Sequence, residues 1–176
     1  MISTLKGSIL LENGSIYDPC NNKNIKGAIL LQNGIIKEVG KFTPPKNVKR
    51  INCQGKIVAP GLIDIHSHFR EPGREDKETL ATGALAAFSG GFTRVCVMPN
   101  TNPPLDSPES IRFILEKAAD LPIHIFPIGA ITKRQEGLEI TEIGEMVQAG
   151  AVAISDDGLP VQNGQVMRYA VEYAQK

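Results

Sequence analysis

The sequence predicts an α/β protein, in which a small β-rich (sandwich) domain over residues 1–58 precedes a parallel sheet with helices over residues 59–176. Residues 1–58 consist of short apolar runs separated by turn residues. After residue 58 the pattern becomes strand, loop and helix, repeated along the chain, which is typical of a parallel sheet. Hydrophobic residues make up 41% of the 176 residues, which is enough for a packed core.

The β-rich region contains two similar segments, residues 8–14 and residues 28–34. Each ends in an Asn-Gly dipeptide, whose two residues favour the positive φ angles of a tight β-hairpin turn. We therefore predict hairpins at Asn13-Gly14 and Asn33-Gly34, followed by a loop at residues 43–46. Two copies of a segment are too few for a repeat array.

The α/β region contains four predicted strand–helix units. The second helix has a clear start, since Ser107 is a favoured N-cap and Pro108 suits the first turn, and the third helix ends at Gly150. The predicted strands cover 57–68, 92–98, 123–128 and 151–155, and the predicted helices cover 76–89, 107–119, 140–148 and 165–175.

Residues 59–176 are expected to be the first four βα units of a (βα)8 barrel, which needs about 250 residues. A doubly wound sheet of fewer strands is the alternative. The sequence stops inside a continuing helical pattern, so we expect the chain to be incomplete. A chain of only these residues is expected to be inactive and to fold poorly, because half a barrel leaves a sheet edge open.

The charge balance and the cysteines restrict the partners. The 19 basic residues balance the 19 acidic residues, which argues against nucleic acid or an anionic membrane as the main partner. No stretch approaches the roughly 18 apolar residues of a membrane span, and the first residues lack the apolar core of a signal peptide. Cys20, Cys53 and Cys96 lack paired spacing and are expected to be reduced thiols of a cytoplasmic protein.

The most informative stretch is the end of the first α/β strand, which carries His66 and His68. Two side chains that are two residues apart on a strand point to the same face, so both imidazoles can reach one metal ion. Arg70 follows on the same parity and would place a cation beside the metal, where an anionic substrate group would lie. The sequence therefore predicts a metal site and a carboxylate site built together.

Alternation along the strands assigns the other faces. Branched residues are expected to face the helices and their polar neighbours the interior, which puts Asn100 and Asp157 inward and Asp156 outward. The expected outward set is Ile63, Ile65, Val95, Val97, Val152 and Ile154, and the expected inward set includes Asp64, Cys96, Met98 and Ala151.

His66, His68 and Asp157 should then meet at the C-terminal edge of the parallel sheet, which is where the active sites of barrels lie. Imidazole and carboxylate are suitable ligands for Zn²⁺ or a similar divalent ion. Asn100 and Arg70 are suited to orienting a substrate rather than to binding the metal.

Simpler interpretations stay open for several residues. The histidine pair could be structural. Asp156 could be the ligand instead of its neighbour, or it could cap the next segment. Arg70 could form a salt bridge with Glu71 or Glu75, in a loop shaped by the Glu-Pro-Gly run. The third histidine, His124, is expected to lie in the core.

Three blocks of sequence resemble one known family. Residues 64–73, 98–104 and 155–158 read Asp-Ile-His-Ser-His-Phe-Arg-Glu-Pro-Gly, Met-Pro-Asn-Thr-Asn-Pro-Pro and Ser-Asp-Asp-Gly. In this order and at this spacing they resemble the dihydroorotases of the longer, bacterial type, within the amidohydrolase superfamily. The resemblance implies the front half of a (βα)8 metal-dependent amidohydrolase barrel, with a β domain built from both chain ends.

The resemblance also implies a reaction, the zinc-dependent reversible cyclisation of N-carbamoyl-L-aspartate to L-dihydroorotate in pyrimidine biosynthesis. His66 and His68 would bind the first of two zinc ions and Asp157 would bridge both, while His68, Arg70 and Asn100 would contact the substrate. A general acid/base aspartate and two further histidine ligands are expected beyond residue 176. The implied partner is this small-molecule substrate, and a homodimer is one assembly that the resemblance allows.

Two other functions stay open. The first is another cyclic amidase, such as a dihydropyrimidinase or an allantoinase, although Arg70 and residues 156–158 fit a dihydroorotase better. The usual bridging group of those amidases is lysine, and no lysine lies between Arg134 and Lys176. The second is a non-catalytic dihydroorotase-like subunit, but such proteins commonly lose the metal ligands that this chain keeps.

Overall fold

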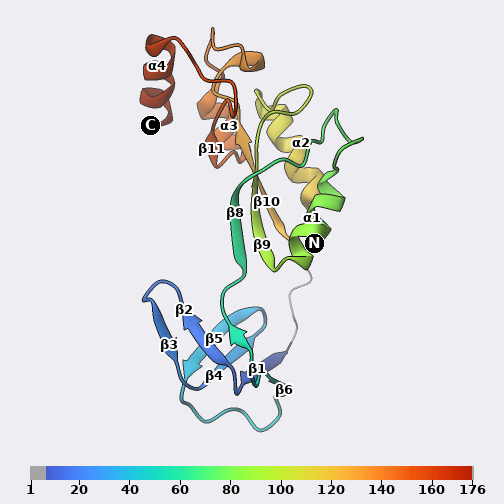
Figure 1. The fold of residues 1–176 in the computed structure, drawn as a ribbon, viewed down its shortest axis with the longest axis vertical. Coiled ribbons are helices and arrows are strands. Elements are labelled where there is room, and N and C mark those ends of the chain that lie inside the picture. The colour runs from blue at the N-terminus through green and yellow to red at the C-terminus, as the bar shows by residue number, and fades with distance from the viewer. Residues whose placement is uncertain (1–6, 176) are drawn as a thin grey trace. The chain divides into compact units, whose positions relative to one another are not determined.

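The structure is a computed structural model that describes residues 7–175. The chain divides into two compact units, of which one ends at Pro60 and the other begins at Gly61. We call residues 7–60 the β unit and residues 61–175 the α/β unit (Figure 1). Among the described residues, no helix has the length and apolar character required to cross a lipid bilayer.

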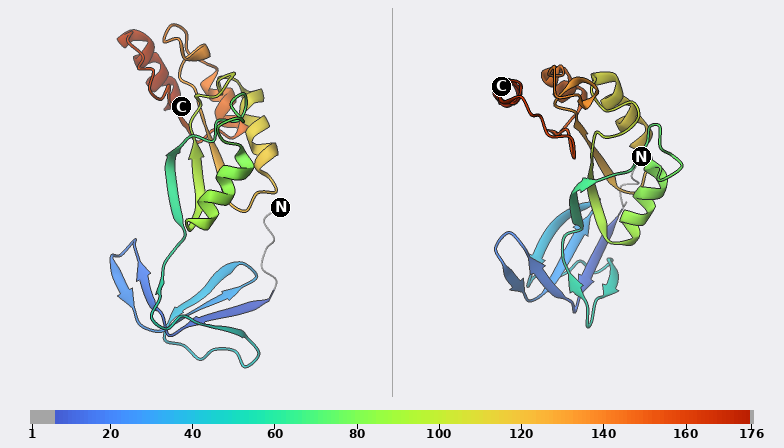
Figure 2. Two further views of the ribbon diagram at one scale, coloured as in Figure 1. Left: turned by 45° about the vertical axis from the view of Figure 1, so that its right-hand side comes forward. Right: turned by 45° about the horizontal axis from the view of Figure 1, so that its top comes forward.

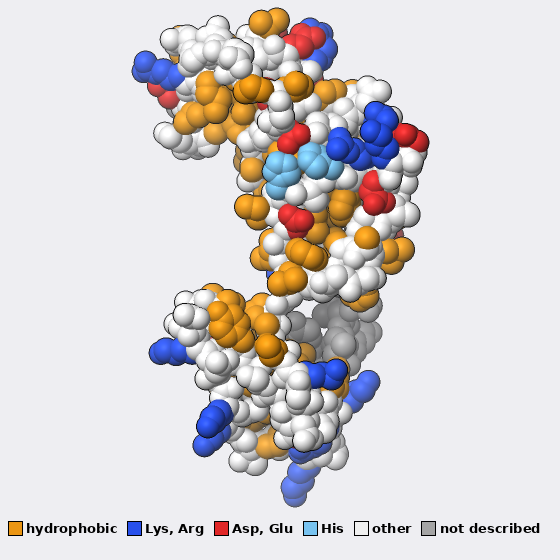
Figure 3. All heavy atoms as spheres, in the orientation of Figure 1, with side chains coloured by type: hydrophobic (Ala, Val, Ile, Leu, Met, Phe, Trp, Pro, Cys, Tyr) orange, Lys and Arg blue, Asp and Glu red, His pale blue; other side chains and the backbone are white. Residues whose placement is uncertain are grey.

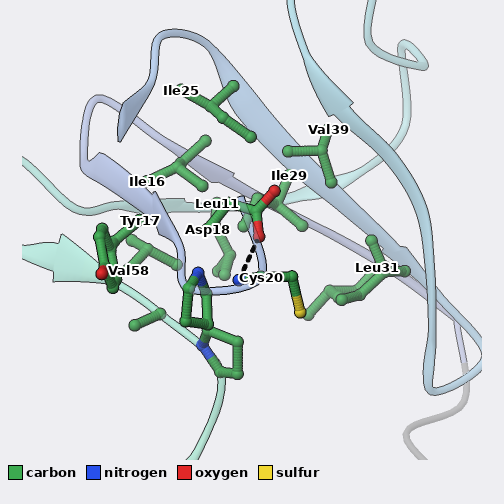
Figure 4. Close-up of a pocket in the computed structure, with 14 residues that line it drawn as sticks. Leu11, Ile16, Tyr17, Asp18, Cys20, Ile25, Ile29, Leu31, Val39 and Val58 are labelled. Atoms are coloured by element: carbon green, nitrogen blue, oxygen red, sulfur yellow. Dashed lines mark hydrogen bonds between the residues drawn. The ribbon is translucent and has the colours of Figure 1, made fainter. Parts of the chain in front are cut away.

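The β unit is built from short strands, namely β1 (Ser8–Glu12), β2 (Ser15–Asp18), β3 (Lys23–Ile25), β4 (Ala28–Gln32), β5 (Ile35–Gly40), β6 (Lys49–Asn52) and β7 (Ile57–Val58). They form two sheets with the strand orders β5-β4-β1-β6 and β3-β2-β7. Side chains of both sheets, among them Ile16, Ile29 and Val39, line an apolar cavity of ≈ 430 Å³ (Figure 4). The predicted small β-rich unit is therefore confirmed.

The two Asn-Gly dipeptides of the β unit have different roles. Asn33 and Gly34 both have positive φ and join the antiparallel strands β4 and β5, so this predicted hairpin is confirmed. The hairpin predicted at Asn13 and Gly14 is wrong, because β1 pairs with β4 and β6 while β2 pairs with β3 and β7. Gly14 instead allows a close approach, since a Cβ there would lie 2.8 Å from Cγ2 of Val58.

The α/β unit contains β8 (Leu62–Ser67), α1 (Leu80–Ser89), β9 (Phe92–Val97), α2 (Pro108–Ala118), β10 (His124–Gly129), the 3₁₀ turn Lys133–Gln135, α3 (Ile143–Ala149), β11 (Ala153–Ile154) and α4 (Gly164–Ala174). Its sheet is parallel throughout, with the strand order β11-β10-β9-β8. Helix α1 packs against β9 and α2 against β10, and Figure 2 shows both helices along one side of the sheet. These features confirm the predicted α/β class.

The core of the α/β unit lies between the sheet and its helices. Val95 and Val97 of β9 are buried and pack in one cluster with Ile114 of α2, as alternation predicts. Helix α2 begins at the predicted N-cap, where Oγ of Ser107 accepts the backbone N–H of Ser110 at 3.3 Å. The cap therefore fixes where this helix begins, and its buried apolar residues hold it against the sheet.

Two predicted strands are shorter than expected. The predicted strand 57–68 is split into β7 and β8, since Pro60 has no N–H to donate to a strand ladder. The predicted strand 151–155 is reduced to β11, and its assigned faces are wrong at the first two residues. Ala151 donates its N–H back to α3 and is buried, so it belongs to the end of that helix, whereas Val152 is half exposed.

Two predicted helices begin later than expected. The predicted helix 76–89 begins at Leu80, because the Thr79 hydroxyl accepts the N–H of Thr82 and caps the helix there. The predicted helix 140–148 begins at Ile143 and ends, as expected, at a left-handed Gly150. The residues before α1 instead form the loop that follows the histidine pair.

We expect Gly73→Ala to destabilise the protein more than Gly91→Ala. Both glycines have positive φ, 88° and 84°, so each alanine costs about 1–2 kcal/mol of left-handed strain. At Gly73 a Cβ would also overlap the backbone carbonyl of Asn102, whereas nothing lies within 4 Å of a Cβ at Gly91. Thermal denaturation of the full-length variants measures the difference. Equal melting temperatures would contradict the close approach of the Gly73 and Asn102 loops.

Candidate metal centre

His66 lies in a β-bulge of β8, and His68 follows directly after the end of this strand. In the pairing of β8 with β9, Asp64 lies beside Val95 and Ser67 lies beside Val97, so β8 advances three residues while β9 advances two. The extra residue breaks the strict alternation on which the predicted faces depend. Inside this bulge the backbone N–H of His66 donates to the Asp64 carboxylate at 2.9 Å.

The bulge makes the predicted faces wrong for the first half of β8. Asp64, expected to face inward, lies on the side of Val95 and lines a shallow hollow with Gly83 of α1. Ile63 and Ile65, expected to face the helices, are 56% and 75% exposed and lie outside the core cluster. The position of the imidazoles therefore depends on the bulge rather than on an unbroken alternation.

His66, His68 and Asp157 lie together at the C-terminal ends of β8 and β11, with His66 still inside β8 and the other two just after the strands. One ligand atom from each residue can be chosen so that all lie within 4.8 Å of one another. Oδ1 of Asp157 is 3.1 Å from Nε2 of His66 and 3.9 Å from Nε2 of His68. Ligand atoms of a tetrahedral zinc site lie about 3.4 Å apart, given bonds of about 2.0–2.1 Å. The donor set therefore fits a divalent cation, and Figure 3 shows histidine, acidic and basic side chains gathered on this face.

Asn100 connects two members of this cluster. Its Oδ1 lies 2.9 Å from Nδ1 of His68, and its Nδ2 donates to Oδ2 of Asp157 at 2.6 Å. An amide oxygen can only accept a hydrogen bond, so Nδ1 of His68 donates it, and in the neutral imidazole Nε2 then keeps its lone pair. This is the imidazole form that binds a metal ion through Nε2.

The two neighbouring aspartates have different environments. Asp156 is buried, and its carboxylate accepts the backbone N–H groups of Ile131 and Thr132 and the hydroxyl of Thr132, at 2.7, 3.1 and 2.5 Å. Asp157 has a left-handed backbone with φ of 51°, and its N–H donates to Oγ of Ser155. Because Asp156 is already committed to the loop after β10, the geometry favours Asp157 as the metal ligand.

Arg70 lies beyond the end of β8, in a loop, so its direction is not set by strand parity. Its backbone has a positive φ of 59°. Within the described residues it forms no ion pair with Glu71 or Glu75, whereas Glu71 pairs with Lys117 of α2. The salt-bridge interpretation of Arg70 is therefore wrong in this structure.

Sequence reasoning missed the supporting residues of the site. The anchoring roles of Asp156 and Glu71 depend on partners far along the chain, and no local pattern identifies those partners.

The expected core position of His124 is wrong, because this residue is exposed at the start of β10 and stacks on Phe126. Burial, with the charge of Asp64, raises the pKa of the Cys96 thiol, which therefore stays protonated near neutral pH.

The fold is shared with solved structures of hydantoinases. The chain aligns with a D-hydantoinase at a TM-score of 0.74 and 21% identity, over 95% of this chain and 37% of that one. It aligns with the L-hydantoinase (dihydropyrimidinase) of Arthrobacter aurescens at a TM-score of 0.73 and 21% identity, over 88% of this chain and 35% of that one. At these identities the similarity shows the fold alone, in which small β sheets precede a parallel sheet with helices.

Residues 55–176 match the family described as Dihydro-orotase-like, and the chain belongs to this family. A dihydroorotase of Acetivibrio thermocellus is 46% identical over 167 residues, which cover 94% of this chain and 39% of that protein. A dihydroorotase of Desulforapulum autotrophicum is 44% identical over 176 residues, which cover 99% of this chain and 40% of that protein. The chain thus spans about two fifths of the length of these curated relatives.

We expect Asp157→Asn to lower zinc affinity and Asp156→Asn to lower stability. Loss of the Asp157 charge should lower zinc affinity by at least about tenfold and leave the metal-free protein equally stable. Loss of the buried Asp156 carboxylate should instead lower stability by about 1–3 kcal/mol. Zinc titration against a chelator and melting in excess chelator measure the two effects. Equal zinc loss in both variants, or loss only in the Asp156 variant, would contradict the assignment.

Asn100→Ala should weaken zinc binding by about 10- to 100-fold, because His68 loses the acceptor that selects its metal-binding tautomer. The matched control is Asn102→Ala in the same loop. The backbone N–H of Asn102 donates to the carbonyl of Pro72, and this bond does not depend on the side chain that the substitution removes. The same chelator competition applies. Unchanged zinc affinity in the Asn100 variant would show that this hydrogen bond does not orient the imidazole.

Proposed function

We propose that the protein containing this chain is a dihydroorotase, which cyclises N-carbamoyl-L-aspartate to L-dihydroorotate reversibly and depends on zinc. One observation carries the proposal: two imidazoles and the Asp157 carboxylate lie within ligand distance of one another at the ends of parallel strands, in a chain of the dihydroorotase-like family. Each residue role below is part of this proposal.

His66, His68 and Asp157 would hold the metal, with Asp157 shared between two zinc ions. When bound, zinc would supply Lewis-acid polarisation and would lower the pKa of a water molecule. In the neutral imidazole, Asn100 would hold the proton of His68 at Nδ1 and leave Nε2 to the metal. Asn100 also restrains the second oxygen of Asp157, so that the carboxylate keeps one oxygen directed toward the histidines.

Arg70 would bind the substrate carboxylate, since a guanidinium can form paired hydrogen bonds with a carboxylate. This side chain is not neutralised by the acidic residues of its own loop. Asn100 would contribute a further contact to the substrate carboxylate from the loop after β9. A small, anionic cyclic amide is therefore the class of substrate that the residues of this chain suit.

The location and the assembly belong to the same proposal. Cys20, Cys53 and Cys96 are free thiols, which supports a reducing compartment such as the cytoplasm. The family resemblance allows a homodimer. These features accompany the reaction and do not affect the roles of the site residues.

A second candidate is a cyclic amidase with a neutral substrate, favoured by the fold shared with hydantoinases. Two residues of this chain favour the dihydroorotase instead. Arg70 would have no counter-charge on a neutral ring such as hydantoin, and Asp157 stands where those amidases usually have a lysine.

We expect the full-length zinc-loaded protein to open dihydroorotate and to leave hydantoin and allantoin unreacted. Arg70→Met should lower kcat/KM for dihydroorotate by about 10- to 100-fold, since a charge-assisted hydrogen bond contributes about 1.5–3 kcal/mol. Arg74→Met, in the same loop but paired with Asp76, is the control and should change little. Spectrophotometric ring-opening assays compare the substrates, and a preference for a neutral ring would favour the second candidate.

A further inference from the structure

Arg70 occupies a strained turn. Its φ of 59° lies in the left-handed region, and the N–H of Glu71 donates to the carbonyl of Phe69 at 2.7 Å, which closes a three-residue γ-turn around Arg70. A γ-turn with positive φ at its centre is rare and costs energy for a long side chain. Such strain persists only where the surrounding structure fixes the conformation, and it is found most often at functional sites.

Both neighbours of Arg70 are anchored in the α/β unit. The ring of Phe69 is buried so close to α1 that a Cβ on Gly83 would lie 2.8 Å from it. Glu71 is 6% exposed, and its Oε2 accepts the backbone N–H of Leu80 at 2.8 Å, at the start of α1. The turn is therefore held on one side by packing and on the other by a buried carboxylate.

The second oxygen of Glu71 is bound by a distant cation. Oε1 pairs with Nζ of Lys117, which comes from α2 and lies over the ring of Phe113. The hydrogen bond and the charge of Glu71 raise the pKa of Lys117, so this lysine stays protonated across the neutral range. A buried carboxylate without such a partner would be strongly destabilising.

We propose that Glu71 and Lys117 are positioning residues for Arg70, a role that rests on the proposed binding of a substrate carboxylate by Arg70. Lys117 neutralises the carboxylate next to Arg70, so Glu71 does not compete with the substrate for the guanidinium. Glu71 also ties the γ-turn to the start of α1 and to the last turn of α2. The pair thereby fixes the direction of Arg70 and leaves its charge free.

The test uses the full-length zinc-loaded protein with Glu71→Gln, Lys117→Met and Lys117→Arg. Glu71→Gln retains an acceptor for the Leu80 N–H and removes the charge, while Lys117→Met removes the cation from a half-exposed position and is expected to fold. The control is Arg112→Met, which breaks the exposed pair with Glu109 on the same helix.

We expect KM for dihydroorotate to rise about tenfold or more in Glu71→Gln and Lys117→Met, because small displacements of a binding group have effects up to about 100-fold. The values of kcat and zinc content should stay within about twofold of the parent protein. Lys117→Arg keeps the cation and should keep KM near the parent value, and Arg112→Met should leave KM unchanged. Amide hydrogen exchange across residues 69–79 should become faster in the two impaired variants only.

A merely structural pair would behave differently: melting temperature would fall while KM and exchange in residues 69–79 stayed unchanged, and this result would overturn the proposal. Loss of kcat and zinc together with KM would overturn it as well. If the parent protein fails to open dihydroorotate, the proposed function fails on its own. Hydrogen exchange then decides about positioning: faster exchange in residues 69–79 supports it, and unchanged exchange overturns it.

Discussion

The Asn100 side chain is the interaction on which the arrangement of the site depends. It joins His68, 32 residues earlier in the chain, to Asp157, 57 residues later. An amide offers one acceptor atom and one donor atom, so it determines which partner donates a hydrogen bond and which accepts one. Nδ1 of His68 must donate and the Asp157 carboxylate must accept. The parallel sheet makes this possible, because the ends of its strands lie along one edge.

The carboxylates around this edge are separated by their local partners. Asp64 accepts a backbone N–H inside the bulge, Asp156 accepts three donors from the loop after β10, and Glu71 is bound by a helix start and by Lys117. Each of these carboxylates is therefore bound by groups other than the imidazoles, and Glu71 also has a cation as partner. Asp157 alone of the four directs an oxygen toward both histidines, which is what a cation site requires.

Much of this could be predicted from short-range patterns. The β-rich and α/β regions, the buried face of β9 and the Ser107 cap follow from spacing and local propensity. The Asn33-Gly34 hairpin was predicted for the same reason. Asn13-Gly14 has the same local signal but carries the chain between two sheets, and the β8 bulge gives no signal in the pattern of Ile63 and Ile65. Strand partners decide both features.

The sequence by itself determined the order of strands and helices and the residue types available for a metal site, because hydrophobic period, caps and turn residues act over a few positions. Only the tertiary structure decided what binds the Asp156 carboxylate, and that Glu71 pairs with Lys117 while Arg70 has no ion pair among residues 7–175. Those choices depend on hydrogen bonds from Thr132 and Lys117, which reach the site only after the sheet and its helices have packed.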